Sequence, residues 1–229
     1  MINSRQQLIA HIQQIKQHII RKKEGENLPL IFNKSLAKSD QKNKEVADEN
    51  WKKLSKQIST CSQCALSKTR RKVVIGEGSV QAKVVFIGEA PGAEEDKVGK
   101  PFVGAAGQLL TKIIASIGLK REQVYICNVL KCRPPGNRNP NPEEVKACGG
   151  YLQKQIELIK PKLICALGKF AAHTLLEMDE PIKDLRGREY AYKNIPVIPT
   201  FHPAALLYHP QNKRLVWEDM KKIAKIIKE

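Results

Sequence analysis

From Trp51 onward, short β-rich runs alternate with helical segments, and this alternation limits the possible folds more than any other feature. Alternating strands and helices favour a parallel sheet covered on both faces. We therefore predict an α/β fold with a central, mostly parallel four-stranded sheet flanked by helices on both faces. The expected strands are Val84–Gly88, Val124–Lys131, Lys162–Leu167 and Pro196–Phe201, and the expected helices are Ala105–Ile117, Pro142–Ile159, Lys169–Glu177 and Arg214–Lys228.

Residues 1–48 have a different character. Apolar residues recur at helical spacing from Leu8 to Ile20, which predicts an amphipathic helix, and residues 24–48 are polar without periodicity, as in a linker. We expect an N-terminal helix and linker at 1–48 and one α/β domain at 49–229. Packing on the domain and binding a replication or repair protein are equally compatible with the helix.

The net charge of +17 indicates a polyanionic partner. Most of the excess lies beyond residue 50, because residues 1–50 hold only nine basic and six acidic side chains. Such a field attracts nucleic acid, although ribosome-associated and membrane-surface proteins share it. No apolar run approaches the ~20 residues needed to span a bilayer, and no signal peptide is apparent at the start. We expect a cytoplasmic protein without a membrane partner.

The six cysteines are not expected to form disulfides, because the cytosol keeps thiols reduced. Cys61 and Cys64 form a C-x-x-C pair just before the α/β core, and Cys132 and Cys148 are the candidate partners. A zinc ion and an iron–sulfur cluster are equally compatible with four thiolates, and unrelated cysteines remain a further interpretation. The other two, Cys127 and Cys165, lie in apolar strand runs and are interpreted as buried core thiols.

The unusual residues gather where the expected strands end. Gly88–Gly92 closes the first strand, Asn128 lies late in the second, and His202-Pro203 closes the last. In open parallel sheets, ligands bind beyond the carboxyl ends of the strands. This edge of the sheet is therefore the predicted site.

Several ordered motifs resemble one known family when they are taken together. They are the C-x-x-C pair Cys61–Cys64, the acidic run Gly88–Asp96, Pro101–Leu110, Asn128–Pro140 and His202–Leu207. This combination resembles the family-4 uracil-DNA glycosylases, the iron–sulfur branch of their superfamily, over about residues 51–226. The resemblance implies hydrolysis of the N-glycosidic bond of uracil in single- or double-stranded DNA, by a monomer.

The resemblance also implies a [4Fe-4S] cluster held by Cys61, Cys64, Cys132 and Cys148. In that family the cluster is regarded as structural, because it clamps loops near the DNA surface. Catalysis is therefore expected elsewhere.

Three side chains are implied to handle a uracil that has been flipped out of the DNA. Phe102 stacks on the base, Asn128 reads its edge, and His202 stabilises the negative charge on O2 as the uracil anion departs. The amide of Asn128 suits uracil because it can accept from N3–H and donate to O4, whereas cytosine presents the opposite pattern. The backbone around Gly88, Glu89 and Ala90 is expected to form the other wall of the pocket.

The residue that orients the water is less well defined. The best-known members of the superfamily carry an aspartate at the position of Ala90, so this chain needs another route. Glu89 is the first candidate, with Glu95 or Asp96 behind it. These carboxylates are also suited to excluding the methyl group of thymine or to holding the loop.

Contacts with the rest of the DNA are expected from two sources. A leucine of Ala204–Leu207 is a candidate wedge for the base stack, and relatives often place a basic residue where this chain has Tyr208. Candidate phosphate contacts are Lys131, Arg133, Arg138, Lys213 and Arg214. No chemistry is assigned to His11, His18, His173 or His209.

Two alternatives stay open. One is a non-catalytic iron–sulfur DNA-binding or polymerase-associated accessory protein, although the intact motifs at Gly88–Asp96 and His202–Leu207 disfavour it. The other is an enzyme that traps the abasic sugar covalently on a histidine. The sequence lacks an Arg-Arg-Ile-His-like insertion for that chemistry, so turnover is expected.

Overall fold

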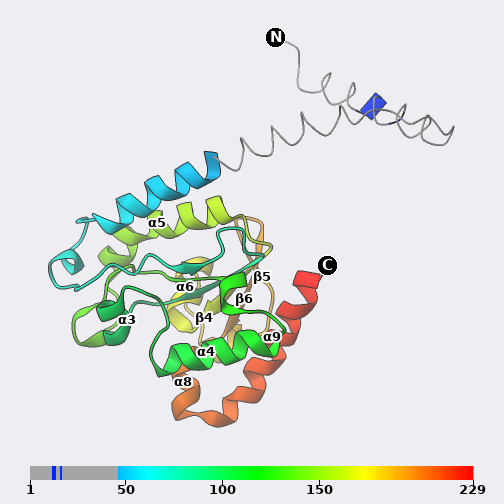
Figure 1. Cartoon of the computed structure of the whole chain (residues 1–229). Helices are drawn as coiled ribbons and strands as arrows, with labels where there is room; N and C mark the ends of the chain where they lie inside the picture. The colour runs from blue at the N-terminus through cyan, green and yellow to red at the C-terminus, as the bar shows by residue number, and fades with distance from the viewer. Residues whose placement is uncertain (1–11, 14–15, 17–45, 229) are drawn as a thin grey trace. The chain divides into compact units, whose positions relative to one another are not determined.

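The computed structural model of the chain describes residues 12–13, 16 and 46–228. One compact unit, Asp48–Glu229, carries the α/β fold (Figure 1). The predicted N-terminal helix and linker fall almost entirely outside the described residues. Within the predicted helix only Ile12, Gln13 and Lys16 are described, and all three are helical. Among the helices that are described, none is both long enough and apolar enough to cross a membrane.

The sheet has six strands in the order β1-β3-β2-β4-β6-β5. The central four run parallel, which confirms the predicted α/β fold, but the expected count of four strands is wrong. The two extra strands are short and lie antiparallel at the edges of the sheet. The strands are β1 (Glu77–Gly78), β2 (Val84–Gly88), β3 (Tyr125–Asn128), β4 (Leu163–Leu167), β5 (Tyr190–Tyr192) and β6 (Ile195–Thr200).

The four α-helices expected from the sequence are present in the unit, each with ends within about two residues of the expected ones. Residues 46–59 are also helical, and short 3₁₀ turns lie at Ala65–Lys68, Arg121–Gln123, Pro135–Asn137 and Pro210–Asn212. Three short helices, α3, α7 and α8, were not expected. The α-helices are α3 (Ala93–Val98), α4 (Ala105–Ser116), α5 (Pro142–Ile159), α6 (Lys169–Leu176), α7 (Ile182–Leu185), α8 (Pro203–Tyr208) and α9 (Lys213–Lys228).

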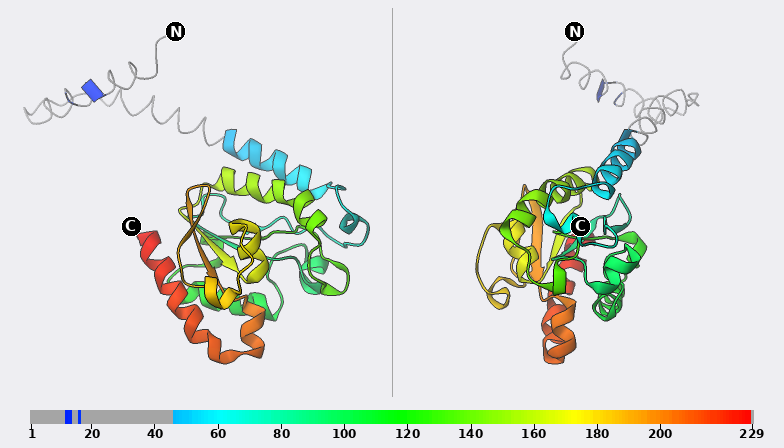
Figure 2. Two further views of the ribbon diagram at one scale, coloured as in Figure 1. Left: turned by 180° about the vertical axis from the view of Figure 1, so that it is seen from behind. Right: turned by 90° about the vertical axis from the view of Figure 1, so that its left-hand side faces the viewer.

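Helices cover both faces of the sheet (Figures 1 and 2). Side chains of a strand alternate between the two faces, so Val85 and Ile87 of β2 pack with α5, α6 and the helix at 46–59. Val84 and Phe86 pack on the opposite face with α4, α8 and α9. This double burial explains why the parallel strands are continuous apolar runs rather than alternating ones.

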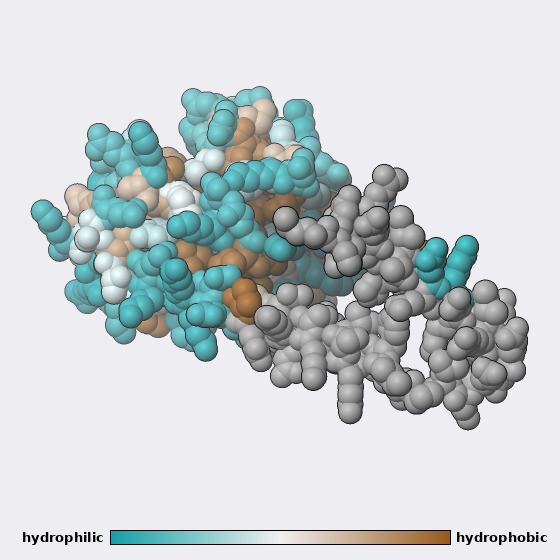
Figure 3. All heavy atoms as spheres, turned by 90° about the horizontal axis from the view of Figure 1, so that it is seen from above, coloured by the Kyte–Doolittle hydropathy of each residue, from teal (hydrophilic) through white to brown (hydrophobic). Residues whose placement is uncertain are grey.

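Hydrophilic side chains form most of the outer surface seen in Figure 3, and hydrophobic ones show between them. Helix α5 begins with a capping box, in which Asn141 caps the first turn and Glu144 accepts from the N–H of Asn141 at 2.9 Å. The buried carboxylate of Asp219 on α9 accepts from Thr200 at 2.6 Å and pairs with Arg186. The contact of Asp219 with Thr200 fixes α9 against the end of β6, at the edge of the sheet where the candidate site lies.

Candidate active site

A cleft of about 400 Å³ opens beyond the carboxyl ends of the parallel strands. Ligands of open α/β sheets bind at this same edge, beyond the carboxyl ends of the strands. Six of the site residues predicted from the sequence line it together: Glu89, Ala90, Glu95, Phe102, Asn128 and His202. The other lining residues are Pro91, Gly92, Ala106, Pro134, Asn137, Arg138, Asn139 and Ala204.

Gly88 lies next to two residues that line the cleft, Asn128 and Phe102. It pairs with Asn128 across β2 and β3, and a Cβ atom placed on it would lie 2.5 Å from Asn128 Oδ1 and 2.6 Å from Phe102 Cζ. Such distances are far inside normal contact. Glycine is therefore needed here so that the amide of Asn128 and the ring of Phe102 can both approach the strand.

The Phe102 ring is held by an unusual backbone conformation. Its φ angle is 52°, in the left-handed region. This conformation is energetically unfavourable for any residue that has a Cβ atom. The following turn is equally tight, because a Cβ atom on Gly107 would lie 1.8 Å from the Phe102 carbonyl oxygen. The ring centroid lies 5.5 Å from that of His202, with 34° between the ring planes.

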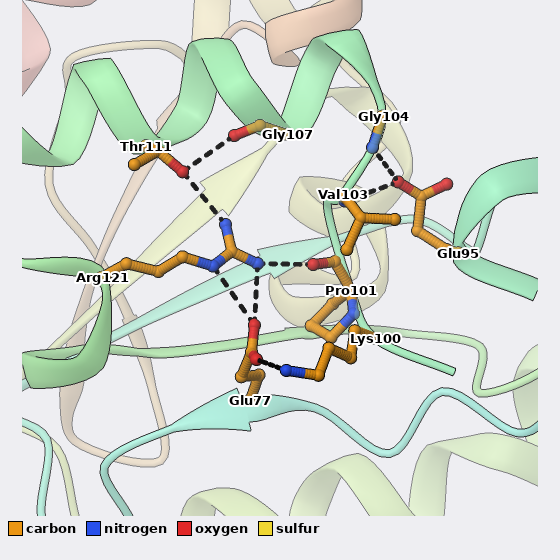
Figure 4. Close-up of polar contacts among 9 residues, drawn as sticks. All are labelled: Glu77, Glu95, Lys100, Pro101, Val103, Gly104, Gly107, Thr111 and Arg121. Carbon is orange, nitrogen blue, oxygen red and sulfur yellow. Dashed lines mark hydrogen bonds and ion pairs between the residues drawn. The ribbon is translucent and has the colours of Figure 1, made fainter. Parts of the chain in front are cut away.

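Hydrogen bonds brace the Phe102 loop on both sides (Figure 4). Glu95 Oε1 accepts from the backbone N–H groups of Val103 and Gly104 at 2.8 and 3.0 Å. On the other side, Arg121 donates to the carbonyl of Pro101 and forms an ion pair with Glu77. The protein's own groups therefore hold this loop in place.

The amide of Asn128 is buried and incompletely paired. The residue is 2% exposed, and its Oδ1 atom has no hydrogen-bond partner among the residues that the structure describes. A buried acceptor without a partner costs free energy of about 1–3 kcal/mol. Because this atom lies beside Phe102 in the cleft wall, a planar ligand with an N–H group would satisfy it.

His202 is the N-cap of α8, and its Nδ1 atom accepts from the N–H of Ala204 at 3.2 Å. Since Nδ1 accepts, the proton of the neutral ring is on Nε2, which is free to donate. Burial lowers the pKa of His202 to about 4, although the negative charge of Glu95 opposes that shift. At neutral pH the cleft therefore contains a neutral imidazole that donates through Nε2.

The three carboxylates predicted to orient water lie in different surroundings. Burial raises the pKa of Glu89, which lines the cleft. Glu95 also lines it, but its Oε1 atom holds the Phe102 loop. Asp96 is buried and accepts from the N–H of Arg71 at 2.9 Å, so its carboxylate anchors the segment that precedes β1. Glu89 remains the first candidate for the base.

The four cysteines predicted as ligands line one small pocket, beside the helix at 46–59 and α5. Three of the four sulfurs receive N–H groups: Arg70 donates to Cys132 Sγ at 3.1 Å, the backbone of Lys131 donates to Cys148 Sγ at 3.3 Å, and the backbone of Gln63 donates to Cys61 Sγ at 3.5 Å. Burial raises the pKa of Cys148 to about 11, and the positive charge of Lys131 opposes that rise. Cys127 and Cys165 are buried in the strands, as predicted.

This donor set suits a thiolate-bound centre. The four cysteines line one pocket, and N–H groups directed at sulfur are typical of the surroundings of iron–sulfur clusters. Within the described part of the chain, no three or more His, Cys, Asp or Glu side chains are arranged to hold a single metal ion.

The structure separates the two leucines of α8. Leu206 is 1% exposed and packs in the core, whereas Leu207 is 46% exposed and Tyr208 is 81% exposed. Only Leu207 is therefore available as a wedge for the base stack.

The predicted phosphate contacts also differ from one another. Lys213 and Arg214 are exposed, whereas Arg133 donates to Asn137, and Arg138 pairs with Glu144 at 2.6 Å. The prediction for Lys131 is wrong, because that residue is 2% exposed and its ammonium group donates to the carbonyl of Asn128.

Comparison with known proteins identifies the family. The sequence matches the uracil DNA glycosylase superfamily over residues 75–221. It is similar to the type-4 uracil-DNA glycosylases of Archaeoglobus fulgidus (49% identity, covering 75% of this chain and 90% of the relative) and Thermotoga maritima (46%, covering 77% and 94%). The type-4 uracil-DNA glycosylase of Sulfurisphaera tokodaii is 44% identical over a match that covers 78% of this chain and 85% of the relative. This chain belongs to the type-4 uracil-DNA glycosylases.

The region that matches the uracil-DNA glycosylase superfamily contains every residue that lines the cleft. It also contains Cys132 and Cys148, whereas Cys61 and Cys64 precede it. The family resemblance deduced from the motifs is confirmed.

Sequence reasoning missed two residues beside the cysteines of this type-4 uracil-DNA glycosylase. Arg70 joins Cys132 Sγ to the carbonyl of Cys61, and Tyr151 of α5 lines the same pocket. Neither residue belongs to a local motif. The only available signal was that Arg70 closely follows the C-x-x-C pair.

Proposed function

We propose that this chain hydrolyses the N-glycosidic bond of uracil in DNA, which releases free uracil and leaves an abasic site for base excision repair. The unpaired Oδ1 atom of buried Asn128 carries this proposal, because it lies beside Phe102 in the cleft. Uracil offers N3–H to Oδ1 and O4 to the amide NH₂ group, and its flat face suits the Phe102 ring. Membership of the type-4 family supports the same substrate.

The reaction breaks the bond between C1′ of the sugar and N1 of uracil. The bonding electrons leave with the base, and negative charge develops on O2, where Nε2–H of His202 donates. The oxygen of a water molecule bonds to C1′, and Glu89 orients this water and accepts its proton. The uracil anion then takes up a proton from solvent and leaves, and Glu89 returns the proton of the water to solvent.

A strand-cleavage assay tests this function. The purified protein is incubated with an oligonucleotide that contains one uracil, and alkali then cleaves any abasic site. We expect a cut at the uracil in the single strand and in the duplex, and none in a thymine control. Uncut uracil DNA would exclude glycosylase activity. A gel-stable adduct between protein and DNA would indicate covalent trapping in place of turnover.

We also propose that Cys61, Cys64, Cys132 and Cys148 hold a [4Fe-4S] cluster. Their common pocket and the N–H groups directed at three of their sulfurs support this assignment. When bound, the cluster supplies no step of the hydrolysis and braces the loops around it. The protein purified without oxygen should be brown with broad visible absorbance, and should contain about four iron atoms per chain. A colourless protein with stoichiometric zinc would refute the assignment.

Leu207 is expected to hold the duplex open after uracil leaves the stack. Replacing it with alanine should lower excision from duplex DNA by roughly tenfold, because unstacking costs a few kcal/mol and the wedge offsets part of it. Single-stranded DNA has no stack to reopen, so its rate should change little. Both rates are measured by single-turnover excision, and an equal loss on the two substrates would argue against the wedge.

The remaining proposals concern the setting of the enzyme. We propose that it acts as a monomer in the cytoplasm, on chromosomal DNA. The sequence of residues 1–48 makes that segment a candidate for binding a replication or repair protein. A non-catalytic accessory role is disfavoured, because such a role has no need for a cleft with a buried amide and a neutral histidine.

A further inference from the structure

Lys131 lines the pocket of the four cysteines, and it is almost fully buried at 2% exposure. Its ammonium Nζ donates to the backbone carbonyl of Asn128 at 2.7 Å. Its own N–H donates to Cys148 Sγ at 3.3 Å, and the next residue is Cys132. One residue therefore contacts the main chain of the proposed uracil reader and one cysteine, and precedes another cysteine.

The charge of Lys131 is not balanced by a carboxylate. None of the ion pairs formed by the described residues includes it. A buried ammonium group costs several kcal/mol unless an opposite charge lies nearby. Lys131 lines the pocket that the four cysteines surround, so thiolates at this pocket would supply that negative charge.

The residues just before Lys131 are hydrogen-bonded to the Gly88–Glu89 segment, which forms one wall of the cleft. The N–H of Val129 donates to the carbonyl of Gly88 at 2.9 Å, and the N–H of Leu130 donates to that of Glu89 at 3.0 Å. On the other side, the carbonyl of Lys131 accepts from Val74 at 2.8 Å. A displacement of Lys131 would therefore move Asn128 and the Gly88–Glu89 wall together.

We propose that Lys131 is a positioning residue that couples the thiolate-bound centre to the reading of uracil. Its ammonium group balances the negative charge of that centre and fixes the main chain of Asn128 in the orientation that binds the base. This inference rests on the proposed function and deepens it, since it says how the cysteine pocket supports recognition in the cleft without touching the substrate.

The test replaces Lys131 with methionine, which keeps the length of the side chain and removes its charge. Lys146→Met is the matched control, because Lys146 is exposed on α5 and close in sequence to Cys148. Binding of free uracil, measured by calorimetry, should weaken about tenfold or more in Lys131→Met, since a hydrogen bond from a charged donor is lost. The reduction potential of the centre should move to a lower value, because a nearby positive charge is gone. The control should change neither quantity.

A second variant separates the charge from the hydrogen bond. Lys131→Gln keeps a donor and loses the charge, so it should lower the potential as far as methionine does while weakening uracil binding less. If neither variant folds with its centre, the wild-type protein decides: saturating uracil should shift its reduction potential, because coupling between two sites is reciprocal. An unshifted potential would then reject the coupling.

The outcomes distinguish this inference from the function on which it rests. A wild-type protein that leaves uracil in DNA contradicts the proposed function. A wild-type protein that excises uracil, together with a Lys131→Met variant whose uracil affinity and potential match those of Lys146→Met, overturns the coupling alone.

Discussion

Replacing Asn128 with aspartate should lower uracil excision by about a hundredfold or more while DNA binding is retained. The carboxylate cannot donate to O4 of uracil, and its charge faces that oxygen in a buried site. One bidentate amide–base contact is worth about 1–3 kcal/mol, and an unsatisfied buried polar group costs a similar amount. Together they approach about 3 kcal/mol, or roughly two orders of magnitude in rate. Single-turnover excision and a filter-binding assay measure the two effects.

Asn141→Asp is a matched control for this experiment. Asn141 caps α5 outside the cleft, and aspartate caps a helix as well as asparagine does. The control should excise uracil at the wild-type rate. If Asn128→Asp is as active as Asn141→Asp, Asn128 does not read the base.

The central strands could be predicted from the sequence because each is an apolar run buried on both faces. The edges of the sheet could not. Strand β1 has two residues and β5 has three, and both form by pairing with a neighbour rather than by a pattern of their own. The second expected strand, Val124–Lys131, was too long, because Val129 and Leu130 continue its apolar run while the chain turns to bring Cys132 to its pocket.

The candidate site was predictable as far as it lies at strand ends. Asn128 and His202 follow buried runs and carry unusual chemistry for those positions, so the parallel sheet alone brings them to one edge. The contacts that organise them were not predictable, because they join distant parts of the chain. Arg70 and Cys132 are 62 residues apart, and no local periodicity reports such a pair.

Lys131 shows how a local argument can fail. A lysine beside Arg133 in a basic chain is normally solvated, which favoured the phosphate contact. Lys131 is buried because the next residue, Cys132, lines the cysteine pocket, and Lys131 lines the same pocket. The identity of the residue was informative, but its environment was set by tertiary structure.

Replacing His202 with asparagine should lower excision by about 10²–10³-fold, the loss typical for one donor to a developing oxyanion. Asparagine is chosen because its side chain can still cap α8 at the position where His202 accepts from Ala204. What is lost is the Nε2–H donor. Normal DNA binding together with a slow chemical step would show that the loss lies in the transition state. Unchanged single-turnover rates would contradict the role of His202.

The pKa of about 4 for His202 makes a second, independent prediction about the same variant. In the unfolded chain a histidine titrates near pH 6.5, so between these values the unfolded state binds a proton that the folded state does not. Unfolding is therefore favoured as the pH falls from about 6.5 toward about 4. From pH 8 to pH 5 the wild type should lose roughly 2 kcal/mol more stability than His202→Asn. Urea unfolding at both pH values measures this difference, and parallel losses in the two proteins would mean that His202 is not held neutral.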